Sequence, residues 1–317
     1  MNRPIFPVSA TIRTWRWLVL AGGGWRRLEL AVRYGIWARP GTPPVLIDTG
    51  YGVRSCASPE RSLPLRLYGR VLRPRLSPDD LMAARLARLG FTPNDVQLAI
   101  ITHFHADHID GLKDLSAARF LVSAEAWQEA SRLGRLGRLG SGIFDELMPL
   151  DFRSRISFID DLPRRTLPFG LGEGHDVLGD GSLLALPLAG HAPGHFGLLW
   201  PDLDPPLLYG VDTQWLWQAI AEDRAPRLAT RLVAHDRTAA RATMARLRAF
   251  AEAGGEVVLC HDPSPDPAHS PEGIALGIEV GPSHGCFAHG GEPVAWRPRF
   301  TRVPTWNAGR TGGSLDG

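Results

Sequence analysis

The stretch Thr102-His103-Phe104-His105-Ala106-Asp107-His108 contains three histidines and one aspartate within six consecutive positions. It follows the apolar run 98–101, which predicts a buried strand, so the four side chains would leave the sheet together at the end of that strand. Neutral imidazoles and a carboxylate are ligands that zinc and similar first-row metals accept. A polar loop whose histidines cap backbone groups is the alternative interpretation. Because histidine is scarce in proteins, so dense a cluster favours a metal site.

Candidate ligands also follow three later strands predicted from the sequence. The predicted strands and the residues after them are 183–188 with Gly190-His191-Ala192-Pro193-Gly194-His195, 207–211 with Asp212, and 257–260 with His261-Asp262-Pro263. A packed sheet holds the ends of its strands rigidly, which a precise coordination geometry requires. A single histidine of this kind is more often structural, but the recurrence predicts that these side chains meet the first cluster in one site.

Asp48 follows another predicted strand, 45–47, in the sequence Asp48-Thr49-Gly50. One interpretation is that its carboxylate only satisfies the backbone of the turn. The other is that it supports the metal site by accepting a hydrogen bond from a ligand, as carboxylates behind a metal centre commonly do. The position at a strand end favours the supporting role.

The composition is that of an ordinary globular protein. Of the 317 residues, 44% are hydrophobic and 21% are charged, and the formal net charge of +2 is too small to indicate a nucleic-acid surface. Three cysteines, Cys56, Cys260 and Cys286, are too few and too far apart for a disulfide framework. No segment is long and apolar enough to span a membrane, and the start of the chain makes a poor signal peptide. We therefore expect a cytoplasmic protein with neither nucleic-acid nor membrane partners.

The remaining pattern predicts one large domain over residues 1–269 and a proline- and glycine-rich extension packed on it over residues 270–317. Further strands are predicted at 15–20 and 28–34, and helices at 77–89, 124–132 and 238–253. The extension contains His284, Cys286 and His289, which are close enough to suggest a second metal site. Partner ligands with matching spacing are missing, so the sequence favours a packed extension without a metal.

Two segments have no single assignment. Residues 53–76 carry six arginines among leucines and would form either a mobile lid over the site or a solvated connection. Residues 133–140 repeat Leu-Gly-Arg, and glycine at every third position disfavours a helix. We expect the second segment to be a flexible surface insertion near the mouth of the site.

The motifs together resemble those of the metallo-β-lactamase superfamily over roughly residues 15 to 265. The resemblance is carried by His103-x-His105-x-Asp107-His108, Asp48-Thr49-Gly50, Gly190-His191-x-Pro193-Gly194-His195, Asp212 and His261. Within the superfamily, the separation of His191 from Asp212 and the His261-Asp262-Pro263 ending are most similar to N-acyl-homoserine lactonases. The resemblance implies an α/β fold, namely an αβ/βα sandwich of two packed mixed β-sheets with helices on the outer faces. Residues 1–269 would form the catalytic domain.

A ligand set and a mechanism are also implied by this resemblance. One metal would take His103, His105 and His191, the other would take Asp107, His108 and His261, and Asp212 would bridge the two. Zinc is expected at both positions, with iron, manganese or cobalt as alternatives because the same ligands accept them. A metal-bound hydroxide would attack an ester-like carbonyl, and Asp107 or Asp212 would relay a proton to the departing alkoxide. The implied enzyme is a metal-dependent hydrolase that opens lactones such as N-acyl-homoserine lactones, an activity called quorum quenching.

One position departs from the lactonase pattern. These enzymes commonly place a tyrosine three positions after the bridging aspartate, where this chain has Trp215. An indole donates one hydrogen bond but lacks the shape and acidity of a phenol, so either another donor substitutes or the substrate differs. The candidates for an apolar wall around an acyl chain are Phe104, Phe196, Trp215 and Trp217, for each of which an ordinary place in the core is an equally good interpretation.

Two kinds of alternative stay open. The same site would serve a thioester hydrolase similar to glyoxalase II, or a phosphodiesterase. A metal-binding regulator without turnover is the other kind, although a complete ligand set argues against it. In the enzymatic cases the partner is a small molecule, with an acyl chain in the lactonase case, and the sequence leaves open whether the chain forms a homodimer.

Overall fold

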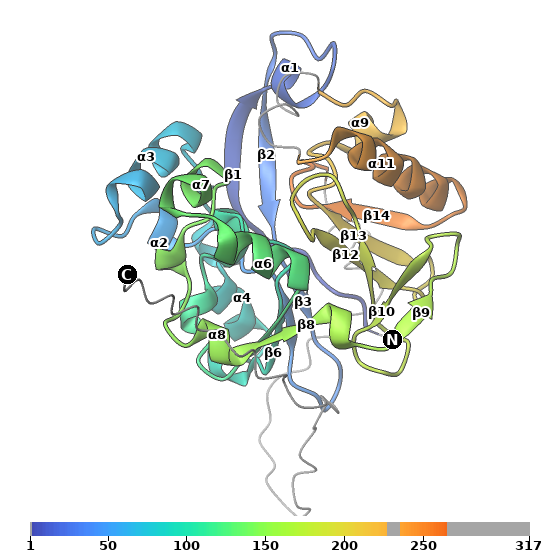
Figure 1. Ribbon diagram of the computed structural model, residues 1–317, viewed down its shortest axis with the longest axis horizontal. Helices are drawn as coiled ribbons and strands as arrows, with labels where there is room; N and C mark the ends of the chain where they lie inside the picture. The colour runs from blue at the N-terminus through green and yellow to red at the C-terminus, as the bar shows by residue number, and fades with distance from the viewer. Residues whose placement is uncertain (1, 227–234, 265–317) are drawn as a thin grey trace, which may run out of the picture. The chain divides into compact units, whose positions relative to one another are not determined.

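The computed structural model describes residues 2–226 and 235–264. The predicted extension 270–317, with His284, Cys286 and His289, lies outside the described residues. In the described ranges, two mixed β-sheets pack against each other and helices cover their outer faces (Figure 1), as the predicted αβ/βα sandwich requires. A third, smaller antiparallel sheet accompanies them.

The strand bounds follow the order of each sheet. The five-stranded sheet consists of β3 (Gly35–Trp37), β4 (Val45–Ile47), β6 (Leu98–Ile100), β7 (Arg119–Val122) and β8 (Ile156–Phe158), in that order. The six-stranded sheet has the order β14 (Glu256–Leu259), β13 (Leu207–Val211), β12 (Phe196–Trp200), β11 (Leu184–Pro187), β10 (Glu173–Asp176) and β9 (Arg164–Thr166). The three-stranded sheet has the order β2 (Arg27–Arg33), β1 (Val8–Trp15) and β5 (Arg75–Leu76).

Both large sheets mix strand directions. In the five-stranded sheet, β4, β6, β7 and β8 run parallel, and β3 pairs with β4 in the antiparallel sense. In the six-stranded sheet, β13 and β14 run parallel and the other pairs are antiparallel. The carboxyl ends of neighbouring parallel strands meet at one edge, so side chains that follow them are brought together.

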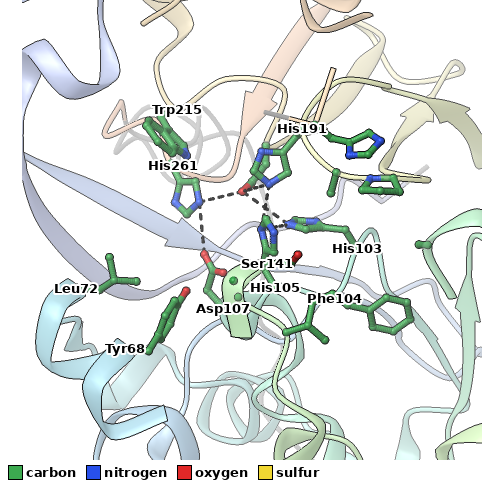
Figure 2. Close-up of a pocket in the computed structure, with 18 of the residues that line it drawn as sticks. Tyr68, Leu72, His103, Phe104, His105, Asp107, Ser141, His191, Trp215 and His261 are labelled. Carbon is green, nitrogen blue, oxygen red and sulfur yellow. Dashed lines mark hydrogen bonds and ion pairs between the residues drawn. The ribbon is translucent and has the colours of Figure 1, made fainter. Parts of the chain in front are cut away.

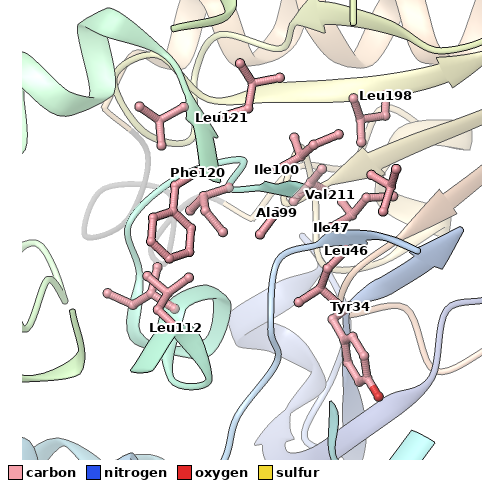
Figure 3. Close-up of a cluster of buried hydrophobic side chains, with 14 of the residues drawn as sticks. Tyr34, Leu46, Ile47, Ala99, Ile100, Leu112, Phe120, Leu121, Leu198 and Val211 are labelled. Atoms are coloured by element: carbon pink, nitrogen blue, oxygen red, sulfur yellow. The ribbon is translucent and has the colours of Figure 1, made fainter. Parts of the chain in front are cut away.

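Alternation along the strands of the six-stranded sheet divides the core into two clusters. Tyr209 points into the cluster between the sheets, and its neighbour Leu208 points into the cluster beneath α11 (Arg237–Glu252). Successive side chains of a strand lie on opposite faces, which explains the division. Figure 3 shows Ile100 and Leu121 of one sheet in the same cluster as Leu198 of the other. The sheets therefore share one apolar interior.

The helices complete the two outer layers. Their bounds are α1 (Arg16–Val19), α2 (Val53–Cys56), α3 (Leu63–Leu72), α4 (Met82–Arg88), α5 (Ala106–Ile109), α6 (Ala124–Arg132), α7 (Arg135–Gly140), α8 (Phe152–Arg155), α9 (Trp217–Ala221) and α11. Phe152 of α8 stacks on Phe120 of β7 with 4.8 Å between ring centroids, while Leu247 of α11 is fully buried against the six-stranded sheet. Within residues 2–226 and 235–264, none of the helices combines the length and apolarity needed to cross a membrane.

Two of the predicted helices, 124–132 and 238–253, are confirmed, and each has a side-chain cap in the structure. Ser123 caps α6 by accepting a hydrogen bond from the backbone N–H of Ala126, and Asp236 caps α11 by accepting from Thr238 and Ala239. The helix predicted at 77–89 is divided instead: a 3-10 turn, Pro78–Asp80, precedes α4. Leu81 separates the two with extended backbone (φ −61°, ψ 148°), which interrupts the helical hydrogen bonds.

Two other predictions need correction. The strand predicted at 15–20 ends at Trp15, and α1 follows it. Residues 133–140 are not irregular, because α7 covers 135–140 and the N–H of Ser141 closes it by donating to the carbonyl of Gly137. Residues 53–76, for which the sequence left two interpretations open, form α2, α3 and β5.

Candidate metal centre

Four strand ends deliver polar side chains to one place in the structure. His103 and His105 follow β6 and lead into α5, which carries Asp107 and His108. The other contributions are His191 after β11, Asp212 after β13 and His261 after β14. Figure 2 shows the side chains of His103, His105, Asp107, His191 and His261 pointing toward one another. Ligand atoms of His108 and Asp212 lie within 4.8 Å of that of His261, so these two belong to the same cluster.

A first group of ligand atoms surrounds the side chain of His105. Its Nδ1 lies 3.0 Å from Nε2 of His103 and 3.1 Å from Nε2 of His191. Oδ2 of Asp212 lies 3.4 Å from Nε2 of His191 and 3.9 Å from Nε2 of His103. These four residues can hold one metal ion.

A second group lies on the other side of Asp212. Its Oδ2 is 3.1 Å from Nε2 of His261 and 3.5 Å from Nε2 of His108. Oδ2 of Asp107 lies 3.4 Å from Nε2 of His261 and 3.7 Å from Nε2 of His108. The sulfur of Cys260 also lies within 4.8 Å of ligand atoms of this group, a proximity that the sequence interpretation missed. A second metal ion can bind here, with Asp212 common to both groups.

Hydrogen bonds behind the ligands fix which imidazole nitrogen faces the centre. Asp48 is fully buried and its Oδ2 accepts from Nδ1 of His108 at 2.8 Å and from Oγ1 of Thr102 at 2.8 Å. Because the Thr102 hydroxyl donates its one proton to Asp48, its oxygen accepts a hydrogen bond from Nδ1 of His103 at 3.1 Å. Nδ1 of His261 donates to the carbonyl of Ala31 at 2.8 Å. In all three histidines Nε2 is therefore the nitrogen that faces the centre.

This arrangement is what a cation site requires. The lone pairs of several imidazoles and the oxygens of Asp212 converge at distances where they repel one another unless a proton or a cation lies between them. Nε2 of His108 and Oδ1 of Asp212 are buried and have no hydrogen-bond partner within the described residues. Buried polar atoms are rarely left unsatisfied, so the donor set fits bound divalent metals.

Burial dominates the electrostatics of the first group. It lowers the pKa of His105 to about 4, and it lowers the pKa of His103 and His191 well below the ordinary value. A buried imidazolium lacks the hydration that would stabilise its charge in water, and neighbouring imidazoles make protonation still less favourable. These histidines are neutral at pH 7 and are ready to act as ligands.

Carboxylates dominate the second group. Burial lowers the pKa of His108, but the charges of Asp48 and Asp212 outweigh it and hold that pKa well above the ordinary value. The pKa of His261 is raised against burial in the same way, mainly by Asp212. Protons and metal ions therefore compete for these two imidazoles.

Further residues hold the ligands in place. His195 donates from Nδ1 to the carbonyl of Leu188 at 2.8 Å, and its Nε2 accepts from the backbone N–H of Asp212 at 3.3 Å, so it orients Asp212. Arg33 is buried and donates to the carbonyls of Asp262 and Ser264, which fixes the chain after His261. No local sequence pattern marks Arg33, because its partners lie more than 220 positions away.

A cavity of about 510 Å³ opens onto the ligand cluster. Phe104 and Trp215 lie on its wall, as proposed for substrate contacts. Phe196 and Trp217 do not: Phe196 is buried between the sheets, and Trp217 packs in the cluster beneath α11. Their side chains cannot contact a molecule in this cavity.

Other lining residues were not identified from the sequence. Apart from the ligands they include Ile12, Thr14, Leu30, Tyr51, Tyr68, Leu72, Glu129, Leu133, Ser141, Ile143 and His235. Tyr51 directly follows the Asp48-Thr49-Gly50 turn, which was a usable signal. The others come from helices and hairpin positions that the strand-end pattern does not include.

Comparison with known proteins identifies the family. The sequence model of the metallo-beta-lactamase superfamily matches residues 35–261, from β3 to the last candidate ligand. The chain belongs to the metallo-beta-lactamase superfamily. Two of its curated relatives illustrate the similarity. The N-acyl homoserine lactonase AttM of Rhizobium radiobacter is 29% identical to this chain over 244 residues, which cover 74% of this chain and 83% of AttM. A probable metallo-hydrolase of Mycobacterium tuberculosis is 38% identical over 80 residues, and this match spans only 25% of the length of each protein.

Solved structures share the metallo-beta-lactamase superfamily fold of this chain. A variant of AiiA from B. thuringiensis, with N-decanoyl-L-homoserine bound at its active site, has a TM-score of 0.61 and 18% identity over 83% of this chain and 94% of that chain. AidC, a dizinc quorum-quenching lactonase, has a TM-score of 0.58 and 16% identity over 83% of this chain and 88% of that chain. At these identities the likeness establishes the fold.

Proposed function

We propose that this protein is a dinuclear metal-dependent hydrolase that opens a lactone, most specifically an N-acyl-homoserine lactone. The observation that carries the proposal is the convergence of the two ligand groups on Asp212 at the wall of a cavity that an ester-like substrate can enter. The similarity to AttM supports the choice of bond, and the dizinc centre named for AidC supports zinc as the metal.

The proposed ligand assignment follows the two groups. His103, His105 and His191 would hold one ion, and Asp107, His108 and His261 would hold the other, with Asp212 shared between the two groups. Asp107 is preferred to Cys260 in the second group because Asp107 lies on the cavity wall, whereas the Cys260 sulfur donates a hydrogen bond to the carbonyl of Arg33 at 3.4 Å.

These residues would hold two divalent ions, and the chemistry supplied by such ions would be Lewis acidity for activating water and polarising the substrate carbonyl. The chain supplies position and proton acceptors. Asp107 and Asp212 are the carboxylates that face the centre, and either can accept a proton and pass it to the departing oxygen. His195 and Asp48 keep Asp212 and His108 in place during turnover.

The cavity wall suits an acyl chain. Phe104, Leu72, Ile143 and Trp215 are among the apolar side chains around the ligand cluster. Burying a methylene group against such a wall contributes about 0.8 kcal/mol, so longer acyl chains gain affinity until the cavity is filled.

The test uses the full chain, and the metal content of the purified protein is measured first. Its rates are compared on short- and long-chain homoserine lactones, a glutathione thioester and a phosphodiester. We expect the purified protein to contain bound metal and to have its highest kcat/KM on a lactone. The Asp212→Asn variant should have lost turnover. A preference for the thioester or the phosphodiester would replace the lactonase assignment, and metal binding without turnover on all of them would indicate a regulator.

A further inference from the structure

Trp215 lies on the cavity wall without supplying a phenol. The indole is partly buried and packs against the apolar cluster that contains Leu20, Leu30 and Ala219. An uncharged hydroxyl donor near the metal ligands must therefore come from another element, if the site has one.

Tyr68 and Tyr51 are the tyrosines on the cavity wall. Tyr68 lies on α3, in the segment 53–76 that the sequence left unassigned, and Tyr51 lies in the loop after β4. Figure 2 shows the Tyr68 hydroxyl directed toward the ligand cluster on the side of Asp107, while Trp215 is on the side of His261.

The hydrogen bond between the two phenols has a direction. The Tyr51 hydroxyl donates to the Tyr68 hydroxyl at 3.1 Å. A phenol has one proton to donate, and among the described residues no acceptor is recorded for that of Tyr68, so it is available to a molecule in the cavity. Burial and the nearby charge of Asp107 raise the pKa of Tyr68, so the phenol keeps its proton at working pH.

Packing holds the Tyr68 ring in place. The ring meets Phe144 edge to face with 5.1 Å between centroids. The start of α3 is fixed by the Ser62 side chain, which accepts from Leu65, and by the Ser62 N–H, which donates to Glu146 at 2.9 Å. A donor that is already oriented loses little entropy on binding its acceptor.

We propose that Tyr68 donates a hydrogen bond from its phenol to the ester-like group of the substrate, and that Tyr51 orients it. This rests on the proposed hydrolase function. The role goes to a side chain on a helix that carries no metal ligand. Tyr68 thereby becomes a residue that determines which substrates the site turns over well.

Tyr68→Phe tests the proposal, because it removes only the hydroxyl. We expect unchanged metal content and a small fall in melting temperature, because the buried Tyr51 hydroxyl loses its acceptor. KM should stay within a few-fold and kcat should fall by roughly 10- to 100-fold, the usual cost of losing a hydrogen bond to developing charge. Tyr51→Phe is the matched variant and should show a smaller fall, because it leaves the donor in place. The ring-opened product should bind the zinc-loaded Tyr68→Phe protein more weakly in calorimetry than the wild type.

Two substrates separate the acceptors. If Tyr68 contacts the departing oxygen, its loss costs more on a lactone than on an aryl ester with a good leaving group; equal losses indicate the carbonyl oxygen. Kinetics are to be measured on whichever substrate the wild type hydrolyses. If Tyr68→Phe then has the kinetics and the product affinity of the wild type, the role of Tyr68 is wrong and the proposed hydrolase function stands. A wild type that neither hydrolyses any substrate nor binds the product would overturn the proposed function, and the role of Tyr68 with it.

Discussion

Oδ2 of Asp48 accepts a hydrogen bond from Nδ1 of His108 at 2.8 Å, and both side chains are fully buried. The same carboxylate accepts from the backbone N–H of Thr102 at 2.9 Å and from its hydroxyl at 2.8 Å. One side chain at the end of β4 therefore orients ligands that follow β6. The charge of Asp48 also makes the His108 imidazole a stronger electron donor.

Asp48→Asn should weaken metal binding about 10- to 100-fold. The amide keeps the size of the carboxylate but lacks its charge, and one of its two oxygens becomes an NH₂ group that cannot accept. Competition with a fluorescent chelator measures the affinity. Asp114→Asn is the control, because Asp114 pairs with Arg54 at the surface. Equal affinities in the two variants would contradict the supporting role of Asp48.

Acid should destabilise the metal-free protein partly through His105. Its pKa falls from 6.5 to about 4 on folding, mainly because of burial. Between these values the unfolded chain binds more protons than the folded chain, so the free energy of unfolding decreases as the pH falls through this window. Chemical denaturation of chelator-treated protein at several pH values should give a shallower slope for His105→Gln than for the wild type. His108 and His261, whose pKa values are raised, act above this window. An unchanged slope would show that His105 is not the group responsible.

Gly190→Ala should destabilise the protein and misplace His191. Gly190 has φ +130°, and a Cβ there would lie 2.4 Å from Cα of Ala240 on α11, so backbone would have to move. The strained backbone and the forced movement each cost about 1–3 kcal/mol. Gly170→Ala is the matched control, since Gly170 also has positive φ (+68°) but a Cβ there meets nothing within 4 Å. Thermal denaturation and metal content should both fall further in Gly190→Ala, and equal losses in the two variants would contradict the steric argument.

Asp107→Asn should lower the metal content from about two ions to about one per chain, whereas Cys260→Ser should retain both. The reason is that Asp107 faces the cavity, whereas Cys260 is fully buried and its thiol donates a hydrogen bond to the carbonyl of Arg33. Elemental analysis gives the stoichiometry, and cobalt substitution should give no thiolate charge-transfer band. Loss of an ion in Cys260→Ser, or such a band in the wild type, would assign the second site to the thiol.

The sequence predicted the ligand-bearing strand ends well because each one is a local pattern. An apolar run fixes a buried strand, and the polar residue after it must then lie at the sheet edge, as at Asp212 and His261. Helices α6 and α11 were predictable for the same reason, since their caps lie beside them in the chain. The convergence itself followed only from recurrence of the pattern.

Long-range packing explains what the sequence did not predict. Phe196 and Trp217 stand near ligands in the sequence but pack into the core. A one-residue step along β12 would reverse the face on which Phe196 lies, and Trp217 is the first residue of α9, which packs against α11. The helix α7 forms despite its glycines because Ser141 and Ile143 donate to the carbonyls at its end. The place of Tyr68 on the cavity wall depends on the packing of its ring against Phe144, a long-range contact that no local pattern predicts.

The wall of the cavity and its floor come from different parts of the chain. Part of the rim is built from α3 and the 133–143 segment, and neither of these carries a proposed metal ligand. Rim segments can therefore be lengthened, shortened or grafted from a relative while the sheets keep the coordination geometry. Such a division gives evolution, or an engineer, independent control over which molecules are admitted and what is done to them.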